Sequence, residues 1–284
     1  MPSHLTTLKI LERGATVLRR LGLGRLVNAV ARRVSGTVGT FDVEIDGLRL
    51  HGDHIGQLYY VRELIESGRE RTFVDLLCAA TPRGGTVLEA GAHMGYITLQ
   101  AARAVGPRGR VVTFEANPRT VPLVERNVAA NSFDDRVTVV PLALGDAPGR
   151  HVFYLSGGGD TSSFHDPGFE ADRIEVDVTT VDRWLEQRVR IDVVKLDIEG
   201  AEVAALRGME RALAHAGAGL VVFAECNPSL LERGGSSADE LIATLRGHGL
   251  EVMWIDEDRR EARPLAEADW SHGYLNLYCR RSTL

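Results

Sequence analysis

The sequence predicts a doubly wound α/β fold, in which helices cover both faces of a mostly parallel sheet. From Thr72 onwards, short apolar runs alternate with segments of helical periodicity, which is the signature of successive βαβ units. Most of these runs are continuously apolar rather than alternating, as expected for strands that are buried on both faces. The predicted main strands are Thr86–Ala90, Arg110–Glu115, Val137–Leu142, Ile191–Ile198 and Leu220–Cys226.

The residues before this repeat predict an appended helix and hairpin rather than a full domain. Apolar residues between Leu5 and Val34 recur at roughly helical spacing, which indicates one or two amphipathic helices. Residues 41–53 alternate as strands do on either side of Asp46-Gly47, a dipeptide typical of two-residue hairpin turns. We expect a cap over residues 1–70 and a main domain over residues 71–284, with the N-terminal helix packed on that domain or forming a homodimer contact.

Additional strands follow the third and fifth main strands. His151–Leu155 and Arg173–Val178 flank a loop, Gly157–Gly168, which is either an active-site loop or a plain insertion. The last two apolar runs, Leu250–Ile255 and Tyr274–Cys279, are joined without a clear helix. The final strand is therefore free to lie antiparallel to its neighbours.

Composition and charge narrow the function to small-molecule chemistry. Of the 284 residues, 44% are hydrophobic and 25% are charged, as in ordinary globular proteins. The net charge of −6 leaves no basic field for a phosphate backbone, which argues against a nucleic-acid partner. We recognise no signal peptide or membrane span, and the three cysteines match no metal or redox spacing. We therefore expect a cytoplasmic protein with a small-molecule substrate.

The most informative motif is TVLEAGAHMGYIT, residues 86–98. It predicts a strand, a turn over residues 91–95 that contains Gly91 and Gly95 (the glycine turn), and a helix, which together form a nucleotide-type pocket. The GxGxxG spacing of dinucleotide sites is absent, so a nicotinamide dehydrogenase is disfavoured. Glu89 would repel a diphosphate but can hold an ammonium group. S-adenosylmethionine carries an ammonium and a sulfonium and has no phosphate.

Carboxylates at two further strand ends support this pocket. Glu115 ends the second strand, near the ~20-residue offset at which doubly wound folds place an acceptor for ribose hydroxyls. In the fourth strand, Lys195, Asp197 and Glu199 share one face if the strand extends that far. Charges in a buried strand are unfavourable unless they pair or function. For Lys195, a structural ion pair and a functional role are equally consistent with the sequence, whereas a functional role is favoured for Asp197.

These motifs resemble the FkbM-type S-adenosylmethionine-dependent methyltransferases. The resemblance rests on VLEAGAHMGYIT, VVTFEANP, PLALGD and VVKLDIEGAE, with FAECNP and YLNLYC as later strands. It implies a class I (Rossmann-like) methyltransferase fold, with a seven-stranded sheet of order 3-2-1-4-5-7-6 and an antiparallel seventh strand. The activity it implies is O-methylation of a sugar, polyketide or other secondary-metabolite hydroxyl. The cofactor contacts expected by position are Glu89, Gly91, Ala92, His93, Gly95, Tyr96, Glu115, Ala116, Asn117, Leu142, Ala143 and Asp197.

Deprotonation of the acceptor hydroxyl requires a general base, for which Asp197 and Glu199 are the best-placed candidates. His93 is an alternative base or a turn residue bonded to backbone, and Lys195 completes the catalytic set. Asp197, Glu225 and Asn227 resemble the Mg²⁺ ligands of catechol-type O-methyltransferases, so a metal is a further hypothesis. N- or carboxyl-methylation and a non-catalytic S-adenosylmethionine-binding protein are the rival functions.

Overall fold

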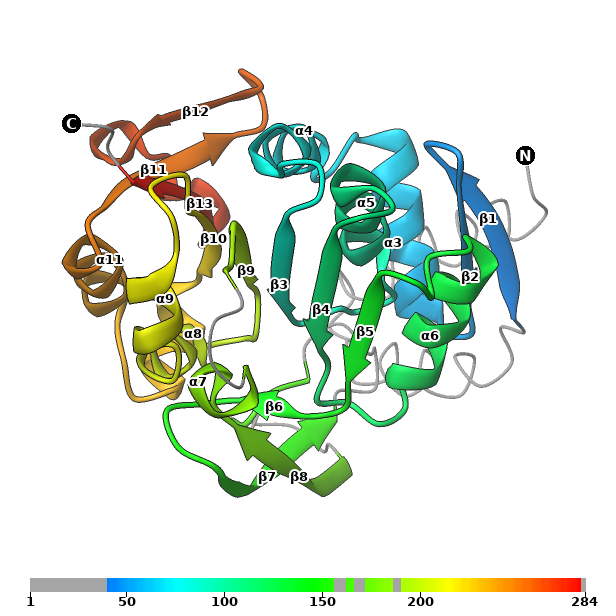
Figure 1. Ribbon diagram of the computed structural model, residues 1–284, viewed down its shortest axis with the longest axis horizontal. Helices are drawn as coiled ribbons and strands as arrows, with labels where there is room; N and C mark the ends of the chain where they lie inside the picture. The colour runs from blue at the N-terminus through cyan, green and yellow to red at the C-terminus, as the bar shows by residue number, and fades with distance from the viewer. Residues whose placement is uncertain (1–39, 156–161, 166–171, 186–189, 282–284) are drawn as a thin grey trace, which may run out of the picture.

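An eight-stranded sheet lies between two layers of helices in the computed structural model, which describes residues 40–155, 162–165, 172–185 and 190–281 (Figure 1). The order of the strands is β12-β11-β13-β10-β9-β3-β4-β5. Their bounds are β3 (Thr86–Ala90), β4 (Arg110–Phe114), β5 (Val137–Val140), β9 (Val193–Leu196), β10 (Val221–Cys226), β11 (Leu250–Asp256), β12 (Glu261–Pro264) and β13 (Leu275–Arg281).

Seven of these strands have the expected order, and β13 is antiparallel to both β10 and β11, which confirms the predicted last strand. The eighth strand is a difference from the prediction. The chain turns back after Asp256 and adds β12 antiparallel to β11 at the edge of the sheet. Its sequence, EARP, is charged and ends in proline, features that suit an edge strand and give no strand signal.

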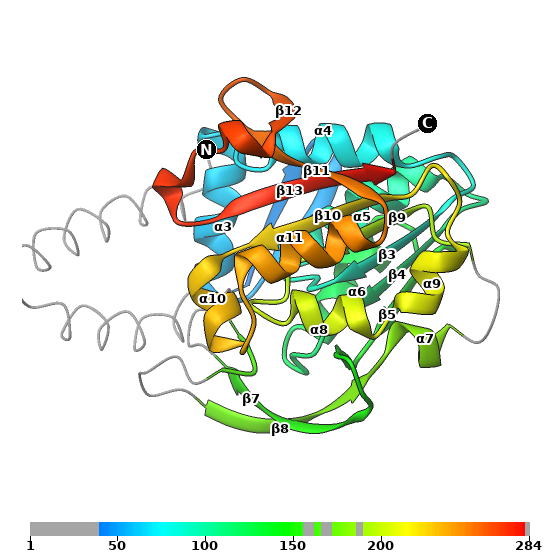
Figure 2. The same ribbon diagram turned by 90° about the vertical axis from the view of Figure 1, so that its left-hand side faces the viewer.

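Two apolar clusters, one on each face of the sheet, form the core. Val87 and Val111 point into one cluster, whereas their neighbours Leu88 and Val112 point into the other, because side chains alternate along a strand. The first cluster includes residues of α3 (Ile55–Glu66), α4 (Arg71–Ala80), α5 (Tyr96–Val105) and α6 (Val121–Ala130). The second includes residues of α8 (Glu202–Arg207), α9 (Glu210–His215), α10 (Pro228–Arg233) and α11 (Ala238–Gly247), of which α11 lies toward the viewer in Figure 2.

The predicted hairpin is present as β1 (Phe41–Ile45) and β2 (Leu48–Gly52). Asp46 and Gly47 both adopt positive φ, at 53° and 76°, as a tight hairpin turn requires. Asn127 of α6 binds the hairpin, since its Oδ1 accepts from the His51 backbone N–H at 2.7 Å. The expected helices between residues 5 and 34, and any dimer contact through them, lie outside the described residues.

A three-stranded sheet lies beneath the carboxyl ends of β4 and β5 (Figure 1). It consists of β6 (Ala143–Leu144), β7 (Gly149–Leu155) and β8 (Asp172–Thr179), so both additional strands predicted here are confirmed. Of the loop Gly157–Gly168, only residues 162–165 are described. The short helix α7 (Val181–Trp184) and two 3₁₀ turns, Leu265–Glu267 and Trp270–His272, complete the elements of the described residues. None of the helices in those residues has the length and apolarity needed to cross a bilayer.

Candidate functional site

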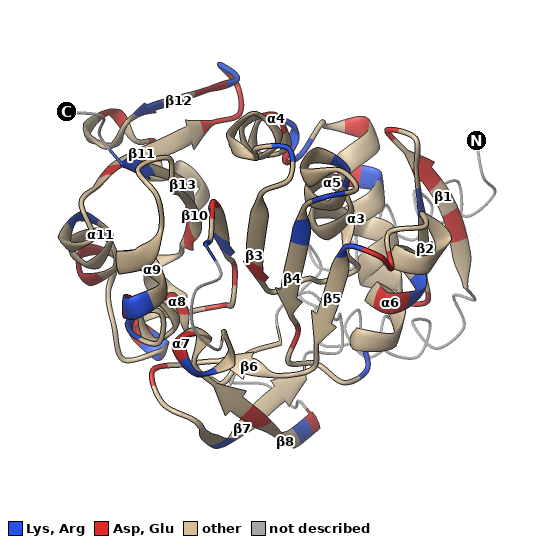
Figure 3. Ribbon diagram, in the orientation of Figure 1, with Lys and Arg blue, Asp and Glu red and all other residues tan. Residues whose placement is uncertain are grey.

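A cavity of about 300 Å³ opens where the central strands β3, β4, β9 and β10 end. Its lining includes most of the residues that the sequence singled out: Gly91, Ala92, His93, Glu115, Ala116, Asn117, Leu142, Ala143, Lys195, Asp197, Glu199 and Glu225. Four predicted residues, Glu89, Gly95, Tyr96 and Asn227, are not part of this lining. Acidic segments follow the lower ends of the central strands in Figure 3.

The glycine turn interlocks with the end of β9. Gly91 has a φ of +84°, and a Cβ atom built on it would lie 1.9 Å from the carbonyl oxygen of Asp197. Only glycine combines this conformation with so close an approach. Gly95, with a φ of +87°, begins α5, and Tyr96 donates its hydroxyl to Asp46 of the hairpin at 2.9 Å.

Glu115 connects the end of β4 to the glycine turn. Its Oε2 accepts from the backbone N–H groups of Ala92 and His93, at 3.1 and 3.2 Å, and its Oε1 accepts from Asn117 at 2.8 Å. Burial raises the pKa of this carboxyl group, and the three N–H groups oppose that shift. Each carboxylate oxygen can accept more than one hydrogen bond, so ribose hydroxyls can bind here as well.

Lys195 lies at the centre of a buried charge cluster. Its Nζ donates to the carbonyl oxygen of Gly91 at 2.5 Å and lies 3.4 Å from Asp197 Oδ2 and 3.8 Å from Glu89 Oε1. Burial lowers the pKa of Lys195, but Asp197, Glu89 and Glu70 more than reverse that shift, so the pKa is raised and the ammonium persists. Glu89 is 1% exposed; its Oε2 accepts from the Thr98 hydroxyl at 2.5 Å, while its Oε1 has no hydrogen-bond partner in the described structure.

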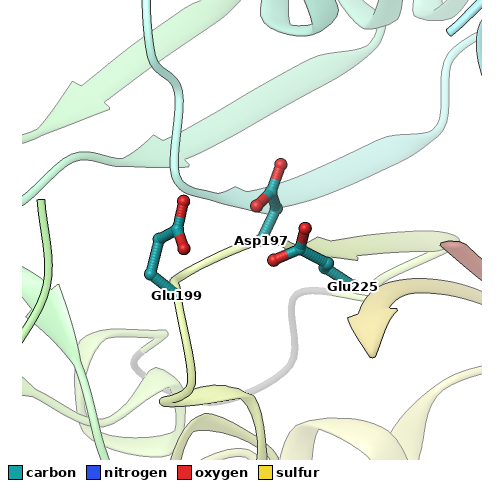
Figure 4. Close-up of side chains that lie close together, drawn as sticks. All are labelled: Asp197, Glu199 and Glu225. Carbon is teal, nitrogen blue, oxygen red and sulfur yellow. The ribbon is translucent and has the colours of Figure 1, made fainter. Parts of the chain in front are cut away.

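The fourth strand, predicted as Ile191–Ile198, is shorter: β9 ends at Leu196, so neither Asp197 nor Glu199 lies on it. Glu199 instead has a φ of +57°, in a turn stabilised by Glu202, whose carboxylate accepts from the backbone of Ile198 at 2.9 Å and of Gly200 at 3.1 Å. This turn brings Glu199 to Asp197, and the end of β10 adds Glu225. One carboxylate oxygen from each of the three lies within 4.8 Å of the others (Figure 4).

The pKa of Glu225 is raised by its burial and by the neighbouring carboxylates of this cluster. Burial, followed by the charges of Asp197, Glu199 and Glu202, raises the pKa of Glu225 to about 9. Asp197, by contrast, is 45% exposed and has Lys195 beside it, so it is the carboxylate of the three best placed to meet a ligand.

Comparison with known proteins identifies the family. Residues 89–252, more than half of the chain, match the model of the methyltransferase FkbM domain. The chain belongs to this family. Its FkbM domain thus includes the glycine turn, Glu115 and the acidic ends of β9 and β10, whereas the β1–β2 hairpin and the helices α3 and α4 precede the matched region.

Curated relatives match this member of the FkbM family over limited segments, and the chain covers about a fifth of the length of the first of them. The human transmembrane O-methyltransferase is 41% identical over 61 residues, which are 22% of this chain and 20% of that protein. The arginine N(omega)-methyltransferase of Streptomyces achromogenes subsp. streptozoticus is 28% identical over 134 residues, 45% of this chain and 35% of that protein. Among solved structures, the O-methyltransferase TomG from Streptomyces achromogenes has a TM-score of 0.46 at 16% identity, covering 78% of this chain and 83% of TomG.

Asn227, the third residue of the metal set expected from the sequence, has hydrogen bonds within its own segment. Asn227 caps α10: its Oδ1 accepts from the Ser229 hydroxyl at 3.0 Å and from the Leu230 backbone N–H at 3.4 Å. Glu199, which was not in the expected metal set, also lies beside Asp197 and Glu225.

Two walls of the cavity come from the N-terminal cap and from the segment around the Gly157–Gly168 loop, where no local sequence pattern singled out individual residues. Tyr59, Tyr60 and Glu63 of α3, with Arg69 and Glu70 just before α4, line it from outside the FkbM domain. Phe153 and Phe164, from β7 and the described part of the loop after it, line it from the three-stranded sheet. Their segments have the pattern of an ordinary amphipathic helix and an edge strand, and only the tertiary fold brings them to the cavity.

Proposed function

We propose that this FkbM methyltransferase transfers a methyl group from S-adenosylmethionine to a hydroxyl of a small molecule, such as a sugar, a polyketide or another secondary metabolite. The observation that carries the proposal is the convergence of the glycine turn, Glu115 and Asp197 on one cavity at the carboxyl edge of the sheet. In doubly wound folds, ligands bind at this edge.

The donors around the cavity suit each part of S-adenosylmethionine. Glu115 offers carboxylate oxygens for the ribose hydroxyls, and Leu142 and Ala143 offer an apolar border for the adenine. Glu89 lies outside the lining but beside the glycine turn, and its buried carboxylate, which faces Lys195, favours a positive charge at the methionine end of the cofactor. When bound, S-adenosylmethionine supplies an electrophilic methyl group on its sulfonium.

Asp197 is the proposed general base for the acceptor hydroxyl. It is the most accessible carboxylate of the cluster, and the ammonium of Lys195 lies 3.4 Å from its Oδ2. Because that ammonium remains protonated, we assign Lys195 to positioning. Its Nζ bridges the carbonyl oxygen of Gly91 and the carboxylate of Asp197 and so holds Asp197 beside the glycine turn. Most of the remaining catalysis is alignment of the acceptor oxygen with the methyl group.

The charge of the cavity favours a second candidate acceptor, an amine or guanidinium cation. Among the described residues, the lining holds six carboxylates but only Arg69 and Lys195 as side chains with a fixed positive charge: the acidic set is Glu63, Glu70, Glu115, Asp197, Glu199 and Glu225. This excess attracts a cation and repels an acid. Carboxyl methylation is therefore the least favoured rival, and the likeness to an arginine methyltransferase makes a guanidinium the natural cation to test.

The donor types of Asp197, Glu199 and Glu225 also suit a hard divalent cation. Mg²⁺ held there would polarise the acceptor hydroxyl and ease its deprotonation. This variant of the proposal predicts that a chelator abolishes turnover. Full activity in EDTA would remove the metal from the mechanism.

Four acceptors test the proposal: catechol, methyl α-glucopyranoside, L-arginine and benzoate, each incubated with the full chain and S-adenosylmethionine. Release of S-adenosylhomocysteine is measured with and without EDTA, and mass spectrometry locates the methyl group. We expect methylation of at least one hydroxyl compound and none of benzoate. Methylation of arginine alone would replace the proposal with the cationic candidate. Binding of S-adenosylmethionine without turnover of any acceptor would contradict an enzymatic role in these classes.

A further inference from the structure

Glu70 departs from local rules in two ways. It is a non-glycine residue with a φ of +62°, a conformation that L-amino acids adopt only against a steric cost. It is also the N-cap residue of α4, yet its carboxylate makes no capping hydrogen bond. Acidic side chains at this position ordinarily accept from the first turn of the helix.

A distant residue performs the capping instead. The carboxylate oxygens of Glu257, in the turn between β11 and β12, accept from the backbone N–H groups of Thr72 at 3.0 Å and Phe73 at 3.3 Å. The side chain of Glu70 is thereby left to line the cavity, where 19% of it is exposed. Glu70 thus has a strained backbone, makes no capping hydrogen bond and lines a pocket. Together these features indicate a functional role.

The carboxylate of Glu70 is held at the glycine turn. Its Oε2 accepts from the Tyr60 hydroxyl at 2.6 Å. The Tyr60 ring in turn packs edge-on against the ring of His93, within the glycine turn, with 4.8 Å between the centroids. Glu70 also faces the charges of Lys195 and Asp197.

The side chains around Glu70 carry an excess of negative charge, which favours the binding of an additional cation. Lys195 is the positive charge that Glu70, Glu89 and Asp197 all face, so three carboxylates share one ammonium. Arg69 lies on the outer side of Glu70, with its Nε 3.8 Å from Glu70 Oε1, and is also paired with Glu63. Burial raises the pKa of Glu70, and an additional bound cation would offset that unfavourable burial.

We propose that Glu70 is a cofactor-binding residue, whose carboxylate is oriented by Tyr60 and receives the ammonium group of the methionine part of S-adenosylmethionine. This inference rests on the proposed function, since it concerns the same cofactor. It extends the cofactor site beyond the FkbM domain, because both residues precede the matched region. Tyr60 acts through Glu70 and is a positioning residue.

Three thioether ligands test this assignment without any acceptor. S-adenosylhomocysteine carries the ammonium and the carboxylate, its decarboxylated analogue keeps only the ammonium, and 5′-methylthioadenosine lacks both. Titration calorimetry with wild type and Glu70→Gln should show that the variant binds the first two about tenfold or more weakly, as expected for loss of a charged hydrogen bond. Binding of 5′-methylthioadenosine should stay within twofold.

Two other variants complete the design. Tyr60→Phe keeps the ring packing but removes the hydrogen bond to Glu70, so it should give the same ligand pattern with a smaller loss. Glu66→Gln removes a carboxylate from α3 at a position outside the cavity lining and should leave all three affinities unchanged. If Glu70→Gln does not fold, which thermal unfolding will reveal, Tyr60→Phe carries the test.

The outcomes separate this inference from the proposed function. Equal loss for all three ligands, or no loss for any, would overturn the assignment of Glu70 while leaving the cofactor site intact. Loss for S-adenosylhomocysteine but not for its decarboxylated analogue would assign the contact to the carboxylate and also overturn it. Failure of the wild type to bind S-adenosylmethionine would instead contradict the proposed function itself.

Discussion

Replacing Gly91 by alanine is expected to abolish S-adenosylmethionine binding. The added Cβ would lie 1.9 Å from the carbonyl oxygen of Asp197, a backbone atom that can move only if the end of β9 moves with it. The positive φ adds a strain of about 1–2 kcal/mol for any L side chain. Because the same displacement disturbs both the glycine turn and Asp197, we expect the affinity, measured by titration calorimetry, to fall by at least about 100-fold, some 2.7 kcal/mol.

Gly84→Ala is the matched control for this variant. Gly84 has nearly the same φ, +81°, but a Cβ built on it meets nothing within 4 Å. Its alanine variant therefore suffers the conformational strain without the collision. We expect a modest drop in thermal unfolding temperature and normal cofactor binding. Equal binding by the two variants would refute the interlock between Gly91 and Asp197.

Asp197→Asn should largely eliminate methyl transfer to a hydroxyl. The amide cannot accept the proton, and general-base catalysis of this kind contributes about 10²–10⁴-fold. Since Asp197 is also an expected cofactor contact, S-adenosylmethionine affinity will fall too, but by less than kcat. The comparison is made with the hydroxyl acceptor that the wild type methylates, by following S-adenosylhomocysteine release at saturating cofactor.

Two comparisons isolate the base. Glu199→Gln neutralises a neighbouring carboxylate of the same cluster and should reduce kcat less, because Asp197 retains its pairing with Lys195. With catechol, the Asp197→Asn defect should shrink as the pH rises and the phenol ionises without help. A defect that is independent of pH, or equally severe with arginine as acceptor, would show that Asp197 acts in binding rather than as a base.

The parts of the site that were predictable from the sequence depend on local pattern and strand topology. A strand followed by a glycine-containing turn marks one edge of the cavity. Carboxyl ends of parallel strands meet at one edge, which places Glu115 and Asp197 together. Asn227 was also recoverable, since asparagine followed by proline is a helix-start signal, and the residue is indeed an N-cap.

Other parts depend on contacts between residues that are far apart in the chain. The condition that β9 extends to Glu199 is not met, because the strand ends at Leu196 and both Glu199 and Gly200 adopt positive φ. Glu70 carries no local signal, because its release from capping α4 depends on Glu257, which is 185 positions beyond the Thr72 N–H that it caps. The replacement of Glu70 by Glu257 as the capping residue of α4 depends on a tertiary contact and has no signal in the local sequence.

The most direct test of the central claim is calorimetric titration of S-adenosylmethionine into the wild type, Glu115→Ala and the control Glu125→Ala, an exposed glutamate on α6. Glu115 accepts three hydrogen bonds from the glycine turn and its own strand end, so its loss should remove both the ribose acceptor and the support of the turn. We predict micromolar, one-to-one binding by the wild type and by Glu125→Ala, and no measurable binding by Glu115→Ala. Absence of binding by the wild type, or undiminished binding by Glu115→Ala, would contradict the assignment of this cavity as the cofactor site.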